Sequence, residues 1–174
     1  MIELGCPRQR MLEQIGITAE MPTIGAEDPL TAPEFLAAAA AHVVVSSRAR
    51  DEILARLNAA LSARFCDVAP QMLERDLLAP IKKAIGNAFK HGNRLDPDKV
   101  VTVELFVTRR GAFVEISDEG AGFDVDATVR KLGAGGKYWE NEGSGFRRFA
   151  KTDSVISFAN GGRTFRACFR TLVD

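Results

Sequence analysis

The stretch IKKAIGNAFKHGN at 81–93 carries three polar side chains that a helix would bring together. Asn87 and His91 lie four residues apart, and Lys83 lies one turn before Asn87, so all three share one face of a predicted helix. An amide, an imidazole and an ammonium group on one stripe would be wasteful in a core, which makes the stripe a candidate site. A solvated polar face is the alternative interpretation, and the stripe alone favours that alternative.

The stretch ISDEGAGF at 116–123 ends a predicted strand in a polar, glycine-rich turn. The ionised carboxylate of Asp118 can accept a hydrogen bond from the amine of a ligand. Gly120 and Gly122 lack a Cβ atom, which lets the backbone turn sharply and lets a flat ligand approach closely. An ordinary turn is the alternative, and the segment alone does not decide between the two.

A second pair of glycines precedes a short predicted helix in EGSGF at 142–146. The backbone N–H groups of Gly143, Ser144 and Gly145, together with the helix dipole, would form a seat for phosphate oxygens. Glycines at a helix start are common, so this segment is weak evidence alone. The order and spacing of the three segments together carry the prediction.

The elements that would position these residues follow from the hydrophobic pattern. Helical spacing of apolar residues predicts helices at 47–65 and 73–91, with Pro80 in the first turn of the second or at a kink. Alternating or β-branched runs predict strands at 42–47, 100–107, 112–118, 154–159 and 163–173. Shorter helices are predicted at 31–41 and 143–152. The glycine-rich segment 119–145 lacks periodicity, which predicts a functional loop.

The order of these elements predicts an α+β fold. We expect a two-layer sandwich in which a mostly antiparallel sheet carries helices on one face. Residues 1–40 are predicted to form an N-terminal extension, in which residues 1–32 are irregular apart from one short helix near Met11. Residues 41–174 then form the main domain.

Composition narrows the classes of function. The 174 residues are 46% hydrophobic and 26% charged, without an apolar run of the length that a membrane span needs, so no membrane association is expected. Lys and Arg balance Asp and Glu at 23 each, which argues against direct nucleic-acid binding. Three cysteines without metal-type spacing and a start that is no secretory signal predict a cytoplasmic location.

The three glycine and asparagine segments, taken with a threonine at 164, resemble the N, G1 and G2 boxes of the GHKL superfamily of ATPases and kinases. Asn87 matches the N box, Asp118-x-Gly120-x-Gly122 matches G1, and Gly143-x-Gly145 matches G2. The resemblance covers roughly residues 41–174 and implies the histidine-kinase-like ATPase fold known as the Bergerat fold. The short HGN that follows the helix looks most like the anti-sigma-factor serine/threonine kinases of bacterial partner-switching systems.

The resemblance implies ATP and Mg²⁺ as ligands and gives each residue a role. Asp118 accepts from the exocyclic amine of adenine with Thr164 helping through a water, and Asn87 binds Mg²⁺ through its amide oxygen. Gly143, Ser144 and Gly145 donate to the phosphates. Residues 124–142 form a lid over the nucleotide, from which Lys131, Lys137 or Arg147 reaches the triphosphate. His91 either approaches the phosphates or ends the helix.

Lys83 departs from the family pattern, because active members commonly have, four residues before the Asn, a Glu that activates the attacking hydroxyl or water as a general base. An ammonium group beside a triphosphate stays protonated and cannot act as a base. Lys83 either contacts a phosphate or extends into solvent. Two alternatives stay open: phosphoryl transfer proceeds without a strong base, or a carboxylate such as Glu74 or Glu119 acts as the base in place of the missing Glu.

Three hypotheses about function follow. The first is an ATP-binding serine/threonine kinase of the anti-sigma type, with a sigma factor and an antagonist protein as partners. The second is a catalytically weak or inactive ATP-binding module that regulates a partner by ordering of the lid. The third is a detached histidine-kinase ATPase domain. A homodimer stays open as an assembly.

Overall fold

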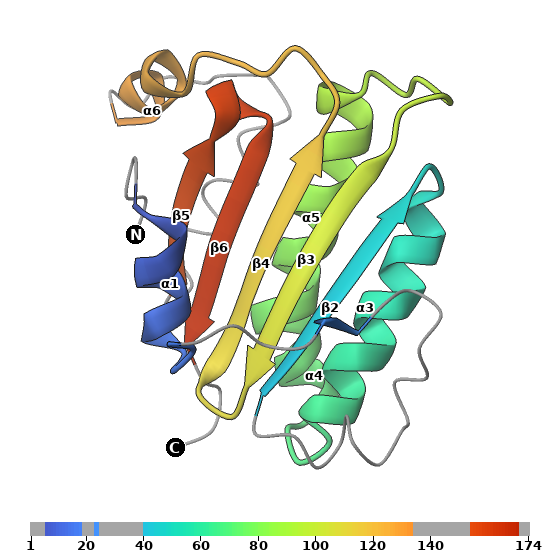
Figure 1. Ribbon diagram of the computed structural model, residues 1–174, viewed down its shortest axis with the longest axis vertical. Coiled ribbons are helices and arrows are strands. Elements are labelled where there is room, and N and C mark those ends of the chain that lie inside the picture. Colours follow the sequence, from blue (N-terminus) through green and yellow to red (C-terminus); the bar gives the residue numbers. More distant parts are fainter. Residues whose placement is uncertain (1–5, 19–22, 25–39, 134–153, 171–174) are drawn as a thin grey trace.

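The protein folds around one mixed sheet (Figure 1). The computed structural model describes residues 6–18, 23–24, 40–133 and 154–170. The strands are β1 (Thr23–Ile24), β2 (Ala40–Ser47), β3 (Val101–Thr108), β4 (Gly111–Asp118), β5 (Ser154–Ala159) and β6 (Thr164–Arg170). Their spatial order is β1-β2-β3-β4-β6-β5; β1 pairs with β2 in parallel, and every other pair is antiparallel. The predicted α+β class with a mostly antiparallel sheet is confirmed.

The helices account for most of the remaining described residues. They are α1 (Arg8–Gln14), α3 (Arg50–Arg64), α4 (Pro70–Leu73), η1 (Glu74–Leu78), α5 (Ala79–Asn87), η2 (Ala88–Gly92), α6 (Val125–Gly133) and η3 (Asn160–Gly162). The four elements from α4 to η2 follow one another without a break, so they form one long helical run. None of the helices in the described ranges has the length and apolar character needed to cross a membrane.

The main core lies between one face of the sheet and the helices α3 and α5 (Figure 1). Side chains alternate between the two faces of a strand, so Val103, Leu105 and Val107 of β3 all point toward these helices. Ile53 and Leu57 of α3 meet them from the helix side and are fully buried. Apolar residues at every second position of β3 therefore line the face that these helices cover.

Pro80 lies inside the long helical run, two residues after the last residue of the π-helical segment η1. Proline has no N–H group and its ring clashes with the carbonyl four residues before it, so it disrupts ordinary α-helical bonding. In η1 the spacing of the bonds widens, and the N–H of Ala79 donates to the carbonyl of Glu74 five residues earlier. The π segment thus accommodates the proline, and of the two predicted positions the structure has Pro80 in the first turn of an α-helix, α5.

The N-terminal helix α1 covers the opposite face of the sheet (Figure 1). Its residues Met11 and Leu12, together with Ile15 directly after the helix, pack on Phe106 of β3 and Phe113 of β4. The prediction of one short helix near Met11 is confirmed. The prediction of helices on one face holds for α3 and α5 but not for α1, because the pattern of a helix does not reveal which face of a sheet it will cover.

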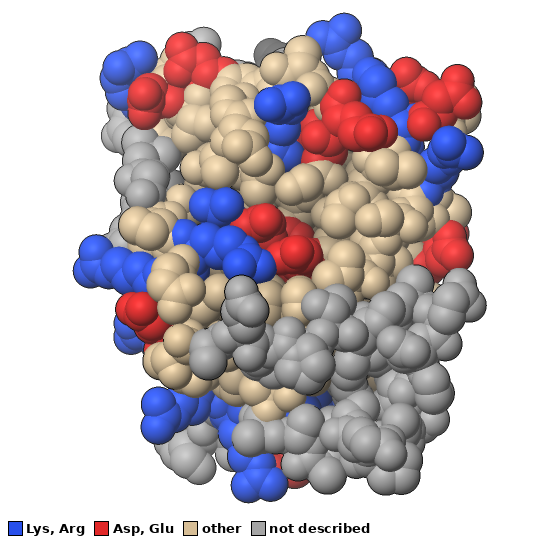
Figure 2. Space-filling view, in the orientation of Figure 1, with Lys and Arg blue, Asp and Glu red and all other residues tan. Residues whose placement is uncertain are grey.

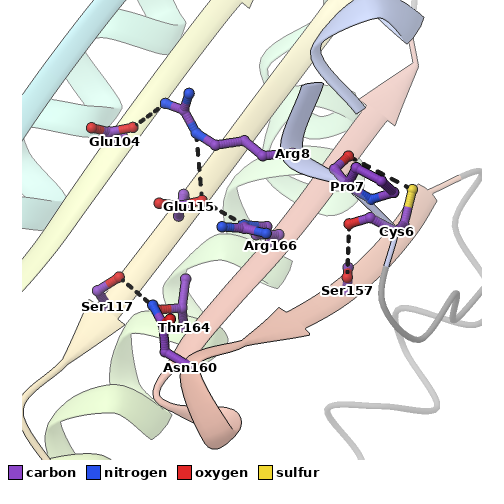
Figure 3. Close-up of polar contacts among 10 residues, drawn as sticks. All are labelled: Cys6, Pro7, Arg8, Glu104, Glu115, Ser117, Ser157, Asn160, Thr164 and Arg166. Atoms are coloured by element: carbon purple, nitrogen blue, oxygen red, sulfur yellow. Dashed lines mark hydrogen bonds and ion pairs between the residues drawn. The ribbon is translucent and has the colours of Figure 1, made fainter. Parts of the chain in front are cut away.

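An ion-pair network ties α1 to the sheet beside this second, smaller core (Figure 3). The Arg8 guanidinium pairs with Glu104 of β3, and its Nε lies 3.5 Å from a carboxylate oxygen of Glu115 on β4. Glu115 also pairs with Arg166 of β6 at 2.5 Å. Basic and acidic side chains accordingly meet near the middle of this face in Figure 2. One arginine from α1 thus completes a cross-strand row of charges.

Part of the segment predicted as an irregular loop is helical. Residues Val125–Gly133 form α6, and the preceding Asp124 caps it because its carboxylate accepts from the N–H of Ala127 at 2.8 Å. The helix predicted at 31–41 lies outside the described residues up to 39, and Ala40 and Ala41 belong to β2. The helix predicted at 143–152 lies outside the described residues as well.

Candidate functional site

The candidate site lies at the end of the sheet where β4 stops and β6 starts, at the top of Figure 1. Asp118 is the last residue of β4 and pairs with Val101, which is fully buried on the helix side of the sheet. The carboxylate of Asp118 therefore points toward the helices. Its backbone N–H donates to the carbonyl of Arg163 at 3.0 Å, which fixes the end of the strand.

Two glycines allow this carboxylate to lie against the end of the long helical run. A Cβ atom on Gly92, the last residue of η2, would come within 3.0 Å of the carboxyl group of Asp118. A Cβ atom on Gly120 would come within 3.0 Å of the carbonyl of Gly92. Real Cβ atoms essentially never approach that closely, so backbone excludes a side chain at Gly120, and a side chain at Gly92 would fit only if the Asp118 carboxyl group moved.

Burial raises the pKa of the Asp118 carboxyl group above its usual range. Three weaker effects oppose this shift: the Gly120 N–H donates to Oδ1 at 2.9 Å, and Arg163 and Lys99 supply nearby positive charge. The carboxylate is thus partly desolvated and incompletely neutralised. Such a group gains from a further hydrogen-bond donor, which a ligand can supply.

Asn93 is a site residue that the sequence pattern did not indicate. Its amide is fully buried and both ends are bonded: Oδ1 accepts from the N–H of Glu119 at 2.8 Å, and Nδ2 donates to the carbonyl of Val100 at 2.9 Å. The N–H of Val100 in turn donates to the Glu119 carboxylate at 2.7 Å. Asn93 ends the HGN that supports the anti-sigma resemblance and begins the polar breaker after the helix, but neither pattern indicates what its side chain bonds.

The second glycine of the turn serves a close contact within the protein. Gly122 has a φ of +74°, and a Cβ there would collide with the carbonyl of Gly161 in η3. The neighbouring Phe123 donates its N–H to that same carbonyl at 2.9 Å. The sequence predicts that Gly120 and Gly122 allow a sharp turn and the close approach of a ligand. The structure adds that backbone of the protein itself lies close to both glycines, that of η2 at Gly120 and that of η3 at Gly122.

Thr164 lies on the other side of the sheet from the Asp118 carboxylate. It pairs across the strands with Ser117, and the two hydroxyl oxygens are 3.0 Å apart (Figure 3). Asn160 also donates to the Thr164 hydroxyl at 3.0 Å. Successive side chains alternate along a strand, so Ser117 and Thr164 share a face that Asp118 does not. The role predicted for Thr164 stays a prediction, and Arg163 is the residue of this turn that approaches Asp118.

The stripe of polar residues on the helix is only partly preserved. Lys83 and Asn87 both belong to α5, so they share a face as predicted, with Lys83 exposed and Asn87 half-buried. His91 is exposed and lies in η2, where bonding between residues five apart widens the turn and shifts it relative to Asn87. Among the described residues, no ion pair involves Lys83.

The two carboxylates considered as substitute bases are engaged elsewhere. Glu74 pairs with Lys82 at 2.7 Å, and Glu119 accepts from the Val100 N–H. The predicted phosphate seat, Gly143, Ser144 and Gly145, lies outside the described residues. The same holds for Lys137, Arg147 and the lid beyond 133, while Lys131 falls within α6.

The described ranges contain no group of three or more His, Cys, Asp or Glu side chains that could hold a metal ion. Any metal near Asn87 would therefore depend on ligands from elsewhere, such as the oxygens of a bound phosphate. Comparison of the chain with protein-family models and with curated proteins finds no match.

Proposed function

We propose that this chain is an ATP-binding regulatory protein resembling the anti-sigma-factor serine/threonine kinases. One observation carries the proposal: a half-buried carboxylate, Asp118, stands at a strand end with the glycines Gly92 and Gly120 packed closely against it. This carboxylate lies against the end of the helical run that carries Asn87. A carboxylate and an amide held on adjoining elements suit the two ends of an adenine nucleotide.

The order of the elements supports the Bergerat fold as the finer description. The described chain runs from a strand, β2, through α3 and the run from α4 to η2, to the hairpin of β3 and β4 and then to the hairpin of β5 and β6. This is the order that the resemblance implies. The long connection from β4 to the edge strand β5 would then include the lid, and β6 returns to pair with β4 beside Asp118.

Base selection would follow from the chemistry of the Asp118 carboxylate. When ionised it only accepts hydrogen bonds, and the exocyclic amine of adenine is a donor. Guanine presents a carbonyl oxygen at the same position, so two acceptors would face each other. Because the carboxylate is already partly desolvated, an unmatched ligand would leave it without the donor it needs. ATP is therefore the expected nucleotide.

Mg²⁺ fits Asn87 only as part of a shared site. The amide oxygen is a suitable ligand for this hard cation, and the half-buried Asn87 forms no side-chain hydrogen bond within the described part of the chain. With no carboxylate cluster beside it, the phosphates and several waters would supply the remaining ligands. The ion would offset phosphate charge, while Asn87 fixes its place along the helix.

Lys83 favours a weakly catalytic module as the second candidate. The side chain is exposed on the same helical face as Asn87, so it can reach the phosphates as a positive charge. It cannot accept a proton, and Glu74 and Glu119 are already bonded to Lys82 and to Val100. Nucleotide binding would then regulate a protein partner, a sigma factor or its antagonist, in the cytoplasm.

Calorimetric titration with ATP tests both candidates. Wild type and Lys83→Glu are compared with and without Mg²⁺, and Arg10→Glu serves as the control because it makes the same charge change at an exposed position of α1, on the other face of the sheet. If Lys83 contacts phosphate, wild type binds ATP without Mg²⁺ and only Lys83→Glu comes to require the metal. If ATP binding needs Mg²⁺ in wild type and in Lys83→Glu and has the same affinity in both, then Lys83 does not contact the phosphates. Absence of ATP binding by wild type refutes the proposed function.

Radiolabelled ATP separates the kinase from the module. Transfer of label to a serine or threonine of a candidate antagonist protein would exclude the weakly catalytic module. If wild type binds ATP but transfers no label, and Lys83→Glu does transfer it, then Lys83 is the residue that suppresses the reaction.

A further inference from the structure

Asn93 connects the two segments that carry the proposed site. It follows the last residue of η2 directly, and its own N–H completes that helix by donating to the carbonyl of Ala88 at 2.8 Å. Its side chain is 0% exposed and reaches across to both neighbouring strands. The acceptor end holds the Glu119 N–H after β4, and the donor end holds the Val100 carbonyl before β3.

The hydrogen bonds around Asn93 form a closed circuit. Asn93 bonds to Val100 and to Glu119, and the Val100 N–H bonds to the Glu119 carboxylate at 2.7 Å. The helix end, the entry to β3 and the exit from β4 are thus fixed to one another. Removing the Asn93 amide opens two of the three links at once.

This circuit controls the direction of the Asp118 side chain without touching it. Glu119 lies between Asp118 and Gly120, so fixing its N–H fixes the peptide plane that follows Asp118. The next N–H, that of Gly120, holds Oδ1 of Asp118 at 2.9 Å. On the other side, the helix end that Asn93 anchors brings Gly92 against the same carboxylate.

We infer that Asn93 is a positioning residue that sets discrimination between adenine and guanine nucleotides by holding the Asp118 carboxylate fixed, an inference that rests on the function proposed above. A fixed carboxylate favours the amine of adenine and opposes the carbonyl of guanine. A mobile carboxylate turns away from guanine at little cost. Loss of Asn93 therefore lowers selectivity more than it lowers affinity for the triphosphate.

Two substitutions at Asn93 and one matched control test the inference. Asn93→Leu keeps the size and removes both bonds, whereas Asn93→Asp keeps the acceptor for the Glu119 N–H. Thr108→Val is the control: its hydroxyl also joins two segments, donating to the carbonyl of Ile15 at 2.8 Å and accepting from the N–H of Arg110 at 2.9 Å. Thr108 lies at the other end of β3, so its loss affects stability without affecting the site.

Titration of each variant with ATP and with GTP gives the main readout. The ratio of the two affinities should fall about tenfold or more in Asn93→Leu, equal to about 1.4 kcal/mol, and less in Asn93→Asp. The ratio should stay at the wild-type value in Thr108→Val. If Asn93→Leu does not fold, Asn93→Asp still tests the inference. An unchanged ratio in the folded Asn93 variants overturns it.

A second readout needs no nucleotide. The titration of the Asp118 carboxyl group, followed by carbon NMR, should move toward the ordinary pKa of aspartate in Asn93→Leu, because the loosened turn admits water. Thr108→Val should leave that titration unchanged. If wild type binds no nucleotide, the proposed function fails while this measurement still decides whether Asn93 positions Asp118. An unmoved titration in both Asn93 variants overturns the positioning role.

Discussion

Two glycines of one helical run should respond in opposite ways to the same substitution. Gly86 lies within α5, and a Cβ atom there would meet only the Arg50 Nε atom at 3.9 Å, an ordinary contact. Gly92 lies six residues later at the end of η2, where a Cβ atom would collide with the carboxyl group of Asp118. The pair therefore separates the helical preference of alanine from the requirement for space at the site.

The magnitudes follow from these surroundings. Gly86→Ala should stabilise the protein by about 1 kcal/mol, because alanine loses less backbone entropy in a helix interior than glycine does. Gly92→Ala should destabilise it by about 1–3 kcal/mol, the usual effect of overpacking. The Asp118 carboxylate must rotate away from the new methyl group, which also breaks its bond with the Gly120 N–H.

Thermal unfolding and ATP titration measure both effects. A change of 1 kcal/mol shifts Tm by roughly 2–4 °C in a chain of this length, so the two variants should differ from wild type in opposite directions. ATP affinity should fall about tenfold or more in Gly92→Ala and stay unchanged in Gly86→Ala. A Gly92→Ala protein as stable as wild type and with full affinity would refute the close approach of η2 to Asp118.

Three further predictions concern the turn after η2, the end of β4 and the helix α1. Leu95 has a φ of +60° and is 70% exposed, so Leu95→Gly should stabilise the protein by about 0.5–1 kcal/mol in denaturant unfolding, whereas Leu95→Ala, which keeps the strain, should not. Asp118→Asn should make the nucleotide-free protein more stable at pH 7 and abolish ATP binding. Because the pKa of Asp118 is raised in the folded protein, the stability of wild type falls as pH rises from the ordinary pKa of aspartate through the raised pKa. An Asp118→Asn variant whose unfolding keeps this pH dependence would contradict the prediction. Arg8→Ala should cost about 1 kcal/mol and speed hydrogen exchange in α1 more than in α3, because Arg8 is the α1 residue that pairs with Glu104 and Glu115; equal exchange in both helices would show that apolar packing alone holds α1.

The sequence predicts those features of the fold whose causes are local. A buried face leaves a repeat of two or 3.6 residues in the chain, which is why β2, α3 and the hairpin of β3 and β4 agree with the predicted ranges. The repeat does not say which side of a sheet a helix will cover, so α1 was assigned no place. The segment 119–145 is predicted as a loop because it is rich in glycine and lacks periodicity, and this pattern does not predict the short helix α6 with its Asp124 cap.

The candidate site divides in the same way. Asp118 and Asn87 are recognisable because their types and spacing bear on ligand chemistry directly. Gly92 and Asn93 matter through contacts with a turn distant in the chain, and no local pattern indicates such contacts. Thr164 was expected beside Asp118, yet alternation along the strand sets its hydroxyl with Ser117, a consequence of pairing register that requires the sheet to be known.

The π segment η1 fixes the rotational phase of everything that follows it in the helical run. It contains one residue more per turn than an α-helix would, so deleting a single residue between 74 and 78 would restore regular bonding at the expense of that phase. The helix beyond would turn by about 100° about its axis. Ile81 and Ile85 would leave the core and the face that carries Lys83 would rotate toward the sheet. Length variation should therefore be poorly tolerated in this helix, even though it contains an irregularity that looks like a place to lose a residue.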